Sequence, residues 1–275
     1  MGWKDAFVQV RERLKTEANL APKEIAVLNS PKVRYMDDVV ETKMLDVLKP
    51  APDFSGYEDE KTVRKTRNFV RRHARAFAAA EKESGPPRHI VAAVLMVETR
   101  LGKYPSRHSV LNVLMSLSAL GVPEFGNDVA EQISKTAAER FPGAEPVDWK
   151  ARASQIGEKW FAELVAYFEL CRIEGWNPRK IKGSWAGAIG HGQFMPTTAL
   201  RNMKRDGETW AANLRNWNDT IRLTARHLEE NGWTAQATEE QRKEAVRKYN
   251  GRAAYADAVF RLAELVEEKP AAPTK

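Results

Sequence analysis

The acid Glu98 is the residue of this 275-residue sequence whose position most strongly suggests chemistry. Residues 90–97 (Ile-Val-Ala-Ala-Val-Leu-Met-Val) are apolar on every helical face, so they predict a buried helix that ends at a carboxyl group. Burial disfavours the charged form of a carboxyl group, raises its pKa and keeps a proton on it near neutral pH. Such a group suits general acid cleavage of a glycosidic bond. The alternative is that Glu98 pairs with Arg100 or another surface cation.

A second candidate segment is rich in glycine. Residues 183–196 read Gly-Ser-Trp-Ala-Gly-Ala-Ile-Gly-His-Gly-Gln-Phe-Met-Pro, with four glycines in the first ten positions. Because glycine has no side chain, such a loop lets the backbone approach a ligand. Its spacing fits neither a phosphate-binding loop nor a dinucleotide fingerprint. A tight connection between helices, in which the glycines serve only turn geometry, is the alternative.

Tyrosine and asparagine side chains form a third candidate group. Tyr249 and Asn250 are adjacent, and Tyr255 follows six residues after Tyr249. At the mouth of a cleft they could stack on a sugar and form hydrogen bonds with it. Tyr255 equally fits a core position at helical spacing with Val259 and Leu262.

Helices are expected to position these residues. Apolar residues recur at helical spacing and alternating, strand-like runs are nearly absent. We expect helices within residues 1–30 (two short ones), 61–82, 90–98, 110–120, 148–173, 219–231 and 253–267. Since the sequence Gly-Pro-Pro at 85–87 ends one helix and starts another, we place an N-terminal helical region at 1–84, a catalytic domain at 85–268 and a flexible tail at 269–275.

Composition limits the class of protein and partner. The 44 Lys and Arg against 37 Asp and Glu give a net charge of +7, which favours nucleic acid, anionic lipid or the acidic stems of cell-wall glycan. No run approaches the ~18 apolar residues of a membrane span, and the sequence begins without the apolar core of a secretory signal. The single cysteine, Cys171, lies in an apolar-periodic stretch and is expected to be a buried packing residue.

Three segments together resemble the lytic murein transglycosylase B family of the lysozyme-like superfamily. Residues 97–102 (Val-Glu-Thr-Arg-Leu-Gly) resemble the catalytic motif of that family, residues 183–198 its glycine-rich segment, and Tyr249-Asn250 its Tyr-Asn element, in the same order. The similarity covers roughly residues 35–267. It implies a mainly α fold, with a lysozyme-like helical catalytic core and an N-terminal helical subdomain.

The resemblance implies a role for each matching residue. Glu98 matches the catalytic acid/base. The expected substrate-binding residues are Ser184, Gln193, Tyr249, Asn250 and Tyr255, together with His191 and His227, which stand where the family has tyrosines. The family's long insert between Trp233 and Tyr249 is absent, which suggests a more open cleft.

The implied reaction is non-hydrolytic cleavage of the β-1,4 bond between N-acetylmuramic acid and N-acetylglucosamine in peptidoglycan. Glu98 would protonate the glycosidic oxygen with help from the substrate's N-acetyl carbonyl. It would then take the proton of the sugar's 6-hydroxyl, forming a 1,6-anhydro end. The alternatives are a hydrolytic muramidase, which uses a second carboxylate, and a non-catalytic wall- or nucleic-acid-binding module, suggested by the basic helix face near Arg71.

No cofactor or metal is expected. The segment 202–209 offers only Asp206 and Glu208 beside two cations, too few oxygen ligands for calcium, and the five histidines are scattered. We expect glycan strands of peptidoglycan as partner, no nucleic acid, a monomeric state, no membrane span or lipid anchor in this chain, and action in the periplasm or cell envelope, after removal of any export signal.

Overall fold

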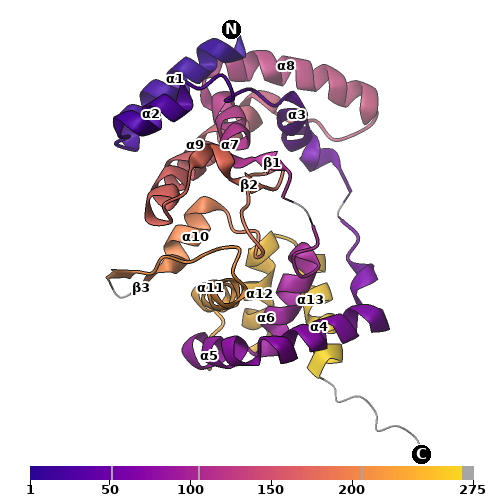
Figure 1. Ribbon diagram of the computed structural model, residues 1–275. Coiled ribbons are helices and arrows are strands. Elements are labelled where there is room, and N and C mark those ends of the chain that lie inside the picture. The colour runs from indigo at the N-terminus through magenta and orange to yellow at the C-terminus, as the bar shows by residue number, and fades with distance from the viewer. Residues whose placement is uncertain (51, 105, 206, 268–275) are drawn as a thin grey trace, which may run out of the picture. The chain divides into compact units, whose positions relative to one another are not determined.

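The computed structural model describes residues 1–50, 52–104, 106–205 and 207–267, apart from the side chain of Glu208. These residues form thirteen α-helices, four short 3-10 helices and four strands of two residues each (Figure 1). The expectation of a mainly α protein is therefore confirmed. The described residues divide into two compact units, of which unit 1 lies within Met1–Ala51, Ser106–Ile189 and Phe194–Leu200, and unit 2 within Pro52–Pro105, Gly190–Gln193 and Arg201–Lys275.

Unit 1 packs around the long helix α9 (Trp149–Ile173), which contacts α7 (Val110–Ser118) and α8 (Pro123–Arg140). The backbone comes very close where Gly157 meets Gly121, since a Cβ on Gly157 would lie 1.9 Å from the Gly121 nitrogen. The other elements of unit 1 are α1 (Trp3–Glu17), α2 (Pro22–Leu28), α3 (Asp37–Leu45), η1 (Asp46–Leu48), β1 (His108–Ser109), η3 (Ala119–Gly121), η4 (Pro178–Lys180), β2 (Lys182–Gly183) and the start of α10 (Pro196–Met203).

Unit 2 surrounds α6 (Arg88–Thr99), which packs against α4 (Glu60–Arg72), α5 (Ala74–Ser84), α11 (Trp217–Glu230) and α13 (Ala253–Glu267) (Figure 1). Residues 90–97 are buried on every side, as their apolar composition predicts. The remaining elements are η2 (Ser55–Tyr57), β3 (Lys204–Arg205), β4 (Glu208–Thr209) and α12 (Glu239–Asn250). None of the helices within the described residues is long and apolar enough to cross a membrane.

The expectation of one helix over residues 61–82 is wrong, because the chain breaks at His73 into α4 and α5. The backbone of His73 leaves the helical region at φ −110° and ψ 27°, although no glycine or proline is present. Its ring packs on Phe69, with centroids 4.7 Å apart, and beside Trp217 at 6.2 Å. We attribute the break to these tertiary aromatic contacts, which local periodicity does not reveal.

The units do not follow the boundaries expected from the sequence. Each unit combines segments from both sides of residue 85, since α1 and α3 pack on α7 in unit 1 while α4 and α5 pack on α6 in unit 2. The division into 1–84, 85–268 and 269–275 stays a prediction about functional domains, and its tail lies outside the described residues.

Candidate functional site

Glu98 lies at the C-terminal end of α6, one residue before the helix ends. The helix stops because Arg100 and Leu101 adopt left-handed conformations, with φ of 49° and 57°. The hydroxyl of Tyr57 donates to the carbonyl oxygen of Val97 at 3.1 Å, which holds the last turn in place. Glu98 itself is half-buried, and its Oε1 atom is buried without a hydrogen-bond partner among the described residues.

Burial makes Glu98 a weak acid. Loss of hydration disfavours the carboxylate and raises the pKa of Glu98 to about 7, although the side chains of Tyr255 and Asn250 favour the carboxylate and offset part of the rise. The carboxyl group therefore carries its proton about half of the time near neutral pH. It can donate a proton and take one back within a single reaction cycle.

Tyr255 occupies the core position that its helical spacing suggested, and its expected contact with sugar stays a prediction. It is fully buried in the core of unit 2, edge-on to Phe54 at 5.7 Å, and its hydroxyl is near enough to Glu98 to affect the pKa of that acid. Tyr249 lies nearly parallel to it, with ring centroids 6.4 Å apart. Asn250 ends α12, and Gly251 follows in a left-handed conformation that turns the chain toward α13.

The part of the glycine-rich segment that belongs to unit 2 is tied to the end of α6. Thr99 Oγ1 donates to the carbonyl oxygen of His191 at 3.0 Å, and Tyr249 Oη donates to that of Gly192 at 2.8 Å. Gly190 has φ +76°, and a Cβ there would lie 2.2 Å from the carbonyl oxygen of Leu214, so the turn requires glycine. These bonds fix residues 190–193 beside Glu98.

Gln193 adopts a left-handed conformation at φ 52°. Its side-chain Nε2 donates to the carbonyl oxygen of Gly190 at 2.8 Å and so closes the turn. The side chain is half-buried, which leaves part of it accessible to a ligand. A non-glycine residue in this backbone region is uncommon, and the contact of Gln193 with sugar stays a prediction.

The two histidines differ in their surroundings. The His191 ring is half-buried and stacks on Trp217 at 4.1 Å and 12°, and burial lowers its pKa, so the ring is neutral. His227 is only 6% exposed and packs edge-on against Tyr249 at 4.9 Å. Burial, with a contribution from Arg201, lowers the pKa of His227 to about 4. His227 thus supports Tyr249 from within the core, and its expected contact with sugar stays a prediction.

Ser184 belongs to unit 1, where it shapes a turn. Its Oγ accepts hydrogen bonds from the backbone nitrogens of Ala186 and Ala188, at 3.2 and 3.0 Å. Glu163 of α9 braces the helix that follows the same segment, because it accepts from the nitrogen and the hydroxyl of Thr197 at 2.9 and 2.6 Å. Within unit 1, Ser184 thus has a structural role in the loop.

Three aromatic residues near Glu98 were not identified from the sequence. Trp217 forms the platform under His191, while Tyr57 and Tyr104 flank the guanidinium of Arg100 at 5.6 and 5.8 Å from their ring centroids. Tyr104 is 49% exposed, which makes it an accessible aromatic surface close to the acid. Its proximity to the Val-Glu-Thr-Arg motif was the available signal.

Within the part of the chain that the structure describes, no three His, Cys, Asp or Glu side chains gather in a way that could hold a metal ion. Asp206 and the side chain of Glu208, the two acids weighed as calcium ligands, lie outside the described residues. The expectation that no metal is needed therefore stays a prediction. Cys171 is buried, as its apolar surroundings predict.

Comparison with known proteins identifies the family. The family model described as the transglycosylase SLT domain matches residues 47–242. The membrane-bound lytic murein transglycosylase B of Escherichia coli K12 is 27% identical over 168 residues, which are 60% of this chain and 37% of that protein. The chain thus spans little more than a third of the length of this curated relative.

Solved structures agree on the fold. The lytic transglycosylase SLT35 of Escherichia coli has a TM-score of 0.70 at 18% identity, with 95% of this chain and 92% of that chain covered. SltB3 of Pseudomonas aeruginosa has a TM-score of 0.67 at 17% identity, covering 95% and 79%. The resemblance seen in three sequence motifs is confirmed by these matches. The chain belongs to the transglycosylase SLT domain family.

Proposed function

We propose that this protein is a peptidoglycan lytic transglycosylase, which cleaves the β-1,4 bond between N-acetylmuramic acid and N-acetylglucosamine without water and leaves 1,6-anhydromuramyl ends. The observation that carries the proposal is Glu98, an acid with a pKa of about 7 at the end of a buried helix, in a chain of the transglycosylase SLT domain family. Solved complexes of SltB3 contain NAG-NAM-pentapeptide and NAG-anhNAM-pentapeptide, which supports a substrate and a product of this kind.

Glu98 performs both proton transfers. In its protonated form it gives a proton to the glycosidic oxygen as the bond to the muramic acid C1 breaks, while the substrate's N-acetyl oxygen stabilises the positive charge at C1. The carboxylate then removes the proton of the 6-hydroxyl, whose oxygen bonds to C1. One carboxyl group with a pKa near the working pH suits both steps.

The residues around Glu98 bind and orient the glycan. We assign sugar contacts to the accessible parts of His191, Gln193 and Asn250, all of which are half-buried or exposed. We assign Tyr249 and Tyr255 to the inner wall of the proposed sugar site. The hydroxyl of Tyr255 favours the carboxylate of Glu98 and so offsets part of the rise in its pKa. Ser184 is assigned to the substrate side of the glycine-rich loop on the strength of the motif match alone.

A hydrolytic muramidase is the competing reaction. That route needs a second carboxylate to activate water or attack the sugar. Among the described residues, the neighbours that affect the pKa of Glu98 are a tyrosine and an asparagine, with no second acid. The one-acid route is therefore favoured.

We also propose that the protein acts in the cell envelope, because its proposed substrate is a wall polymer. We propose a monomeric state as well.

The experiment is to digest purified sacculi with the wild-type protein and with Glu98→Gln, and to analyse the released muropeptides by mass spectrometry. Wild type is expected to release anhydro-ended fragments. The variant should keep its fold by circular dichroism and lose at least about 100-fold in rate, since general acid catalysis typically contributes that much. Reducing ends from wild type would identify a muramidase. A folded variant that keeps a tenth of the rate would remove Glu98 from its role.

A further inference from the structure

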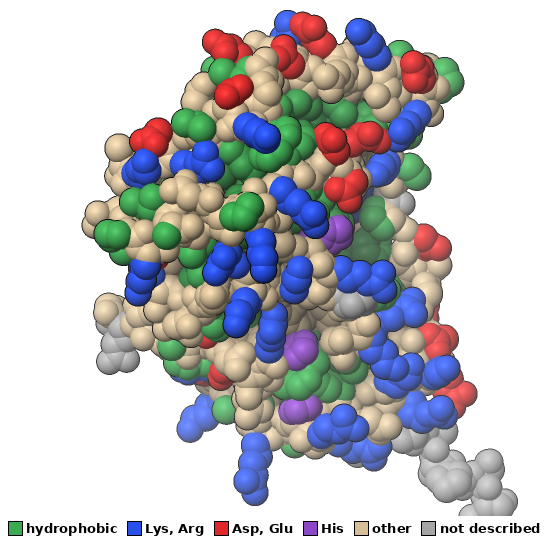
Figure 2. All heavy atoms as spheres, turned by 45° about the horizontal axis from the view of Figure 1, so that its top comes forward, with side chains coloured by type: hydrophobic (Ala, Val, Ile, Leu, Met, Phe, Trp, Pro, Cys, Tyr) green, Lys and Arg blue, Asp and Glu red, His purple; other side chains and the backbone are tan. Residues whose placement is uncertain are grey.

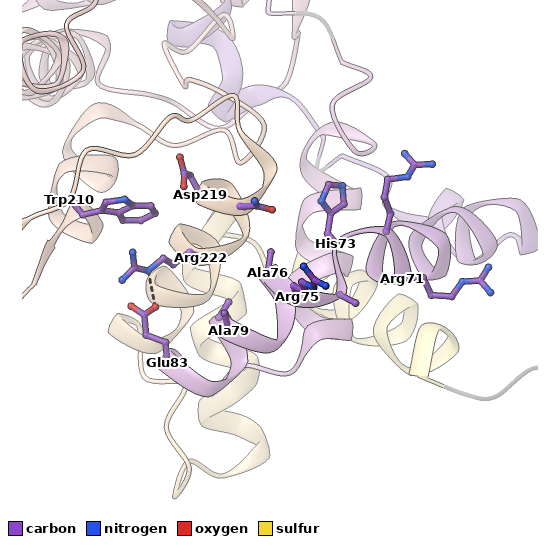
Figure 3. A pocket seen from close by; sticks show the side chains of 13 residues that line it. Arg71, His73, Arg75, Ala76, Ala79, Glu83, Trp210, Asp219 and Arg222 are labelled. Carbon is purple, nitrogen blue, oxygen red and sulfur yellow. Dashed lines mark hydrogen bonds and ion pairs between the residues drawn. The ribbon is translucent and has the colours of Figure 1, made fainter.

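A cavity lies in unit 2, between the adjoining ends of α4 and α5 on one side and α11 on the other (Figure 3). It has a volume of about 900 Å³ and is open to solvent. Its floor is made of small side chains such as Ala76 and Ala79, and Trp210 forms a flat wall. The lining carries four cations against two acids: Arg71, Arg72, Arg75 and Arg222 against Glu83 and Asp219.

The two acids of this arginine pocket already have partners. Glu83 pairs with Arg222 at 2.7 Å and with Arg226 at 2.5 Å. Asp219 accepts a hydrogen bond from the backbone nitrogen of Asn213 at 2.9 Å. The guanidinium of Arg222 also lies 4.3 Å from the Trp210 ring centroid. Arg222 is thus held in place as part of the wall, while the remaining arginines leave the pocket positively charged.

Arg72 and Arg75 have no ion pair or side-chain hydrogen bond with any residue that the structure describes, and both are exposed. Burial, together with the charge of Arg72, lowers the pKa of the neighbouring His73, so this ring is neutral near pH 7 and adds no charge to the pocket. Figure 2 shows Lys and Arg side chains spread over much of the visible face of the molecule. The pocket therefore has the charge and the free donors to bind an anion.

Ring contacts connect the pocket to the candidate active site. His191, which Thr99 holds beside Glu98, stacks on Trp217 at 4.1 Å. Trp217 in turn lies 6.2 Å from the ring of His73, a residue that lines the pocket. The rings of Trp217 and His73 therefore lie between His191, in the proposed sugar site, and the arginines of the pocket. A pentapeptide, which spans at most about 17 Å when extended, can cover such a distance.

We propose that the arginine pocket binds carboxylate groups of the stem peptide attached to the glycan. The proposal rests on the proposed function, and it adds a specificity site for the peptide to a site for the sugar. Planar guanidinium groups bind carboxylates through paired hydrogen bonds, and Trp210 provides a surface for the apolar side chains of the peptide. Glycan with intact stems is then a better substrate than bare glycan.

The test compares wild type with the double variant Arg72→Ala/Arg75→Ala, on glycan strands with stems and on strands stripped of stems by an amidase. The matched control is Arg64→Ala, an exposed arginine on α4 that does not line the pocket. We expect kcat/KM of the double variant to fall about five- to tenfold on stem-bearing glycan, and to equal that of wild type on stripped glycan. The control variant should match wild type on both substrates.

A direct binding measurement separates failure of the pocket from failure of the proposed function. A synthetic stem pentapeptide is titrated while the Trp210 indole resonance is followed by NMR, and the same peptide with amidated carboxylates is titrated in parallel. Binding of the acid form alone, lost in the double variant, supports the pocket even if no anhydro ends form. Equal losses on both glycans, or no Trp210 response to the acid peptide, overturn it. Preferential loss of duplex DNA binding in the double variant would also overturn it and assign the pocket to nucleic acid.

Discussion

Replacement of Glu98 by glutamine should stabilise the folded protein at alkaline pH. The pKa of Glu98 is about 7 in the folded chain, against 4.5 for the ordinary group, so the folded state binds this proton more tightly than the unfolded state does. At pH below 4.5 both states hold the proton. Between roughly pH 4.5 and 7 only the unfolded state loses it, so the contribution of Glu98 to stability declines and then stays low at higher pH.

The size of this effect follows from the two pKa values. At about 1.4 kcal/mol per pH unit, the decline amounts to about 3 kcal/mol between pH 4 and pH 8. Glu98→Gln has no proton to lose, so urea unfolding at pH 4, 6 and 8 should show the variant gaining about 3 kcal/mol on wild type across that range. Glu264→Gln, at an exposed position of α13, is the control and should show no such gain. Parallel pH profiles for wild type and Glu98→Gln would refute the burial of this acid.

Three further outcomes follow from the site. Tyr255→Phe removes a hydroxyl that favours the carboxylate of Glu98, so the alkaline limb of the pH–rate profile should move to higher pH; an unmoved or lowered limb would contradict the contact. Gly190→Ala should lower the free energy of unfolding by at least about 2 kcal/mol in thermal melts, because its Cβ would meet the Leu214 carbonyl oxygen at 2.2 Å, whereas Gly232→Ala, at φ +111° with no close neighbour, should cost less. Treatment with EDTA should leave activity and melting temperature unchanged, and a fall reversed by calcium would reveal a site formed by backbone carbonyls.

The acid and those helices with a regular apolar pattern could be predicted from the sequence because both depend on local pattern, whereas α3, α8, α10 and α12 were not expected. Residues 90–97 allow no polar face, so burial of the helix and a desolvated Glu98 follow directly from composition. The helix expected over residues 253–267 has those bounds in the structure, since its apolar spacing is regular and Gly251 precedes it.

What the sequence could not reveal depends on contacts between distant segments. The break at His73 arises from the packing of its ring on Phe69 and beside Trp217. The ring of His191 stacks on the same Trp217, which lies in a helix more than twenty residues after His191 in the sequence. His227 matched a cleft position by alignment with the family motif, yet it is 6% exposed, because burial is decided by neighbours such as Tyr249.

Digestion of sacculi in water enriched in heavy oxygen distinguishes the two reactions, because it shows whether water enters the product. We predict that fragments released by wild type carry anhydro ends with no heavy oxygen, and that Glu98→Gln releases them at least about 100-fold more slowly. Incorporation of one heavy oxygen into every new muramic acid end would contradict the non-hydrolytic reaction, since it would show that water, and not the substrate's own 6-hydroxyl, attacks C1.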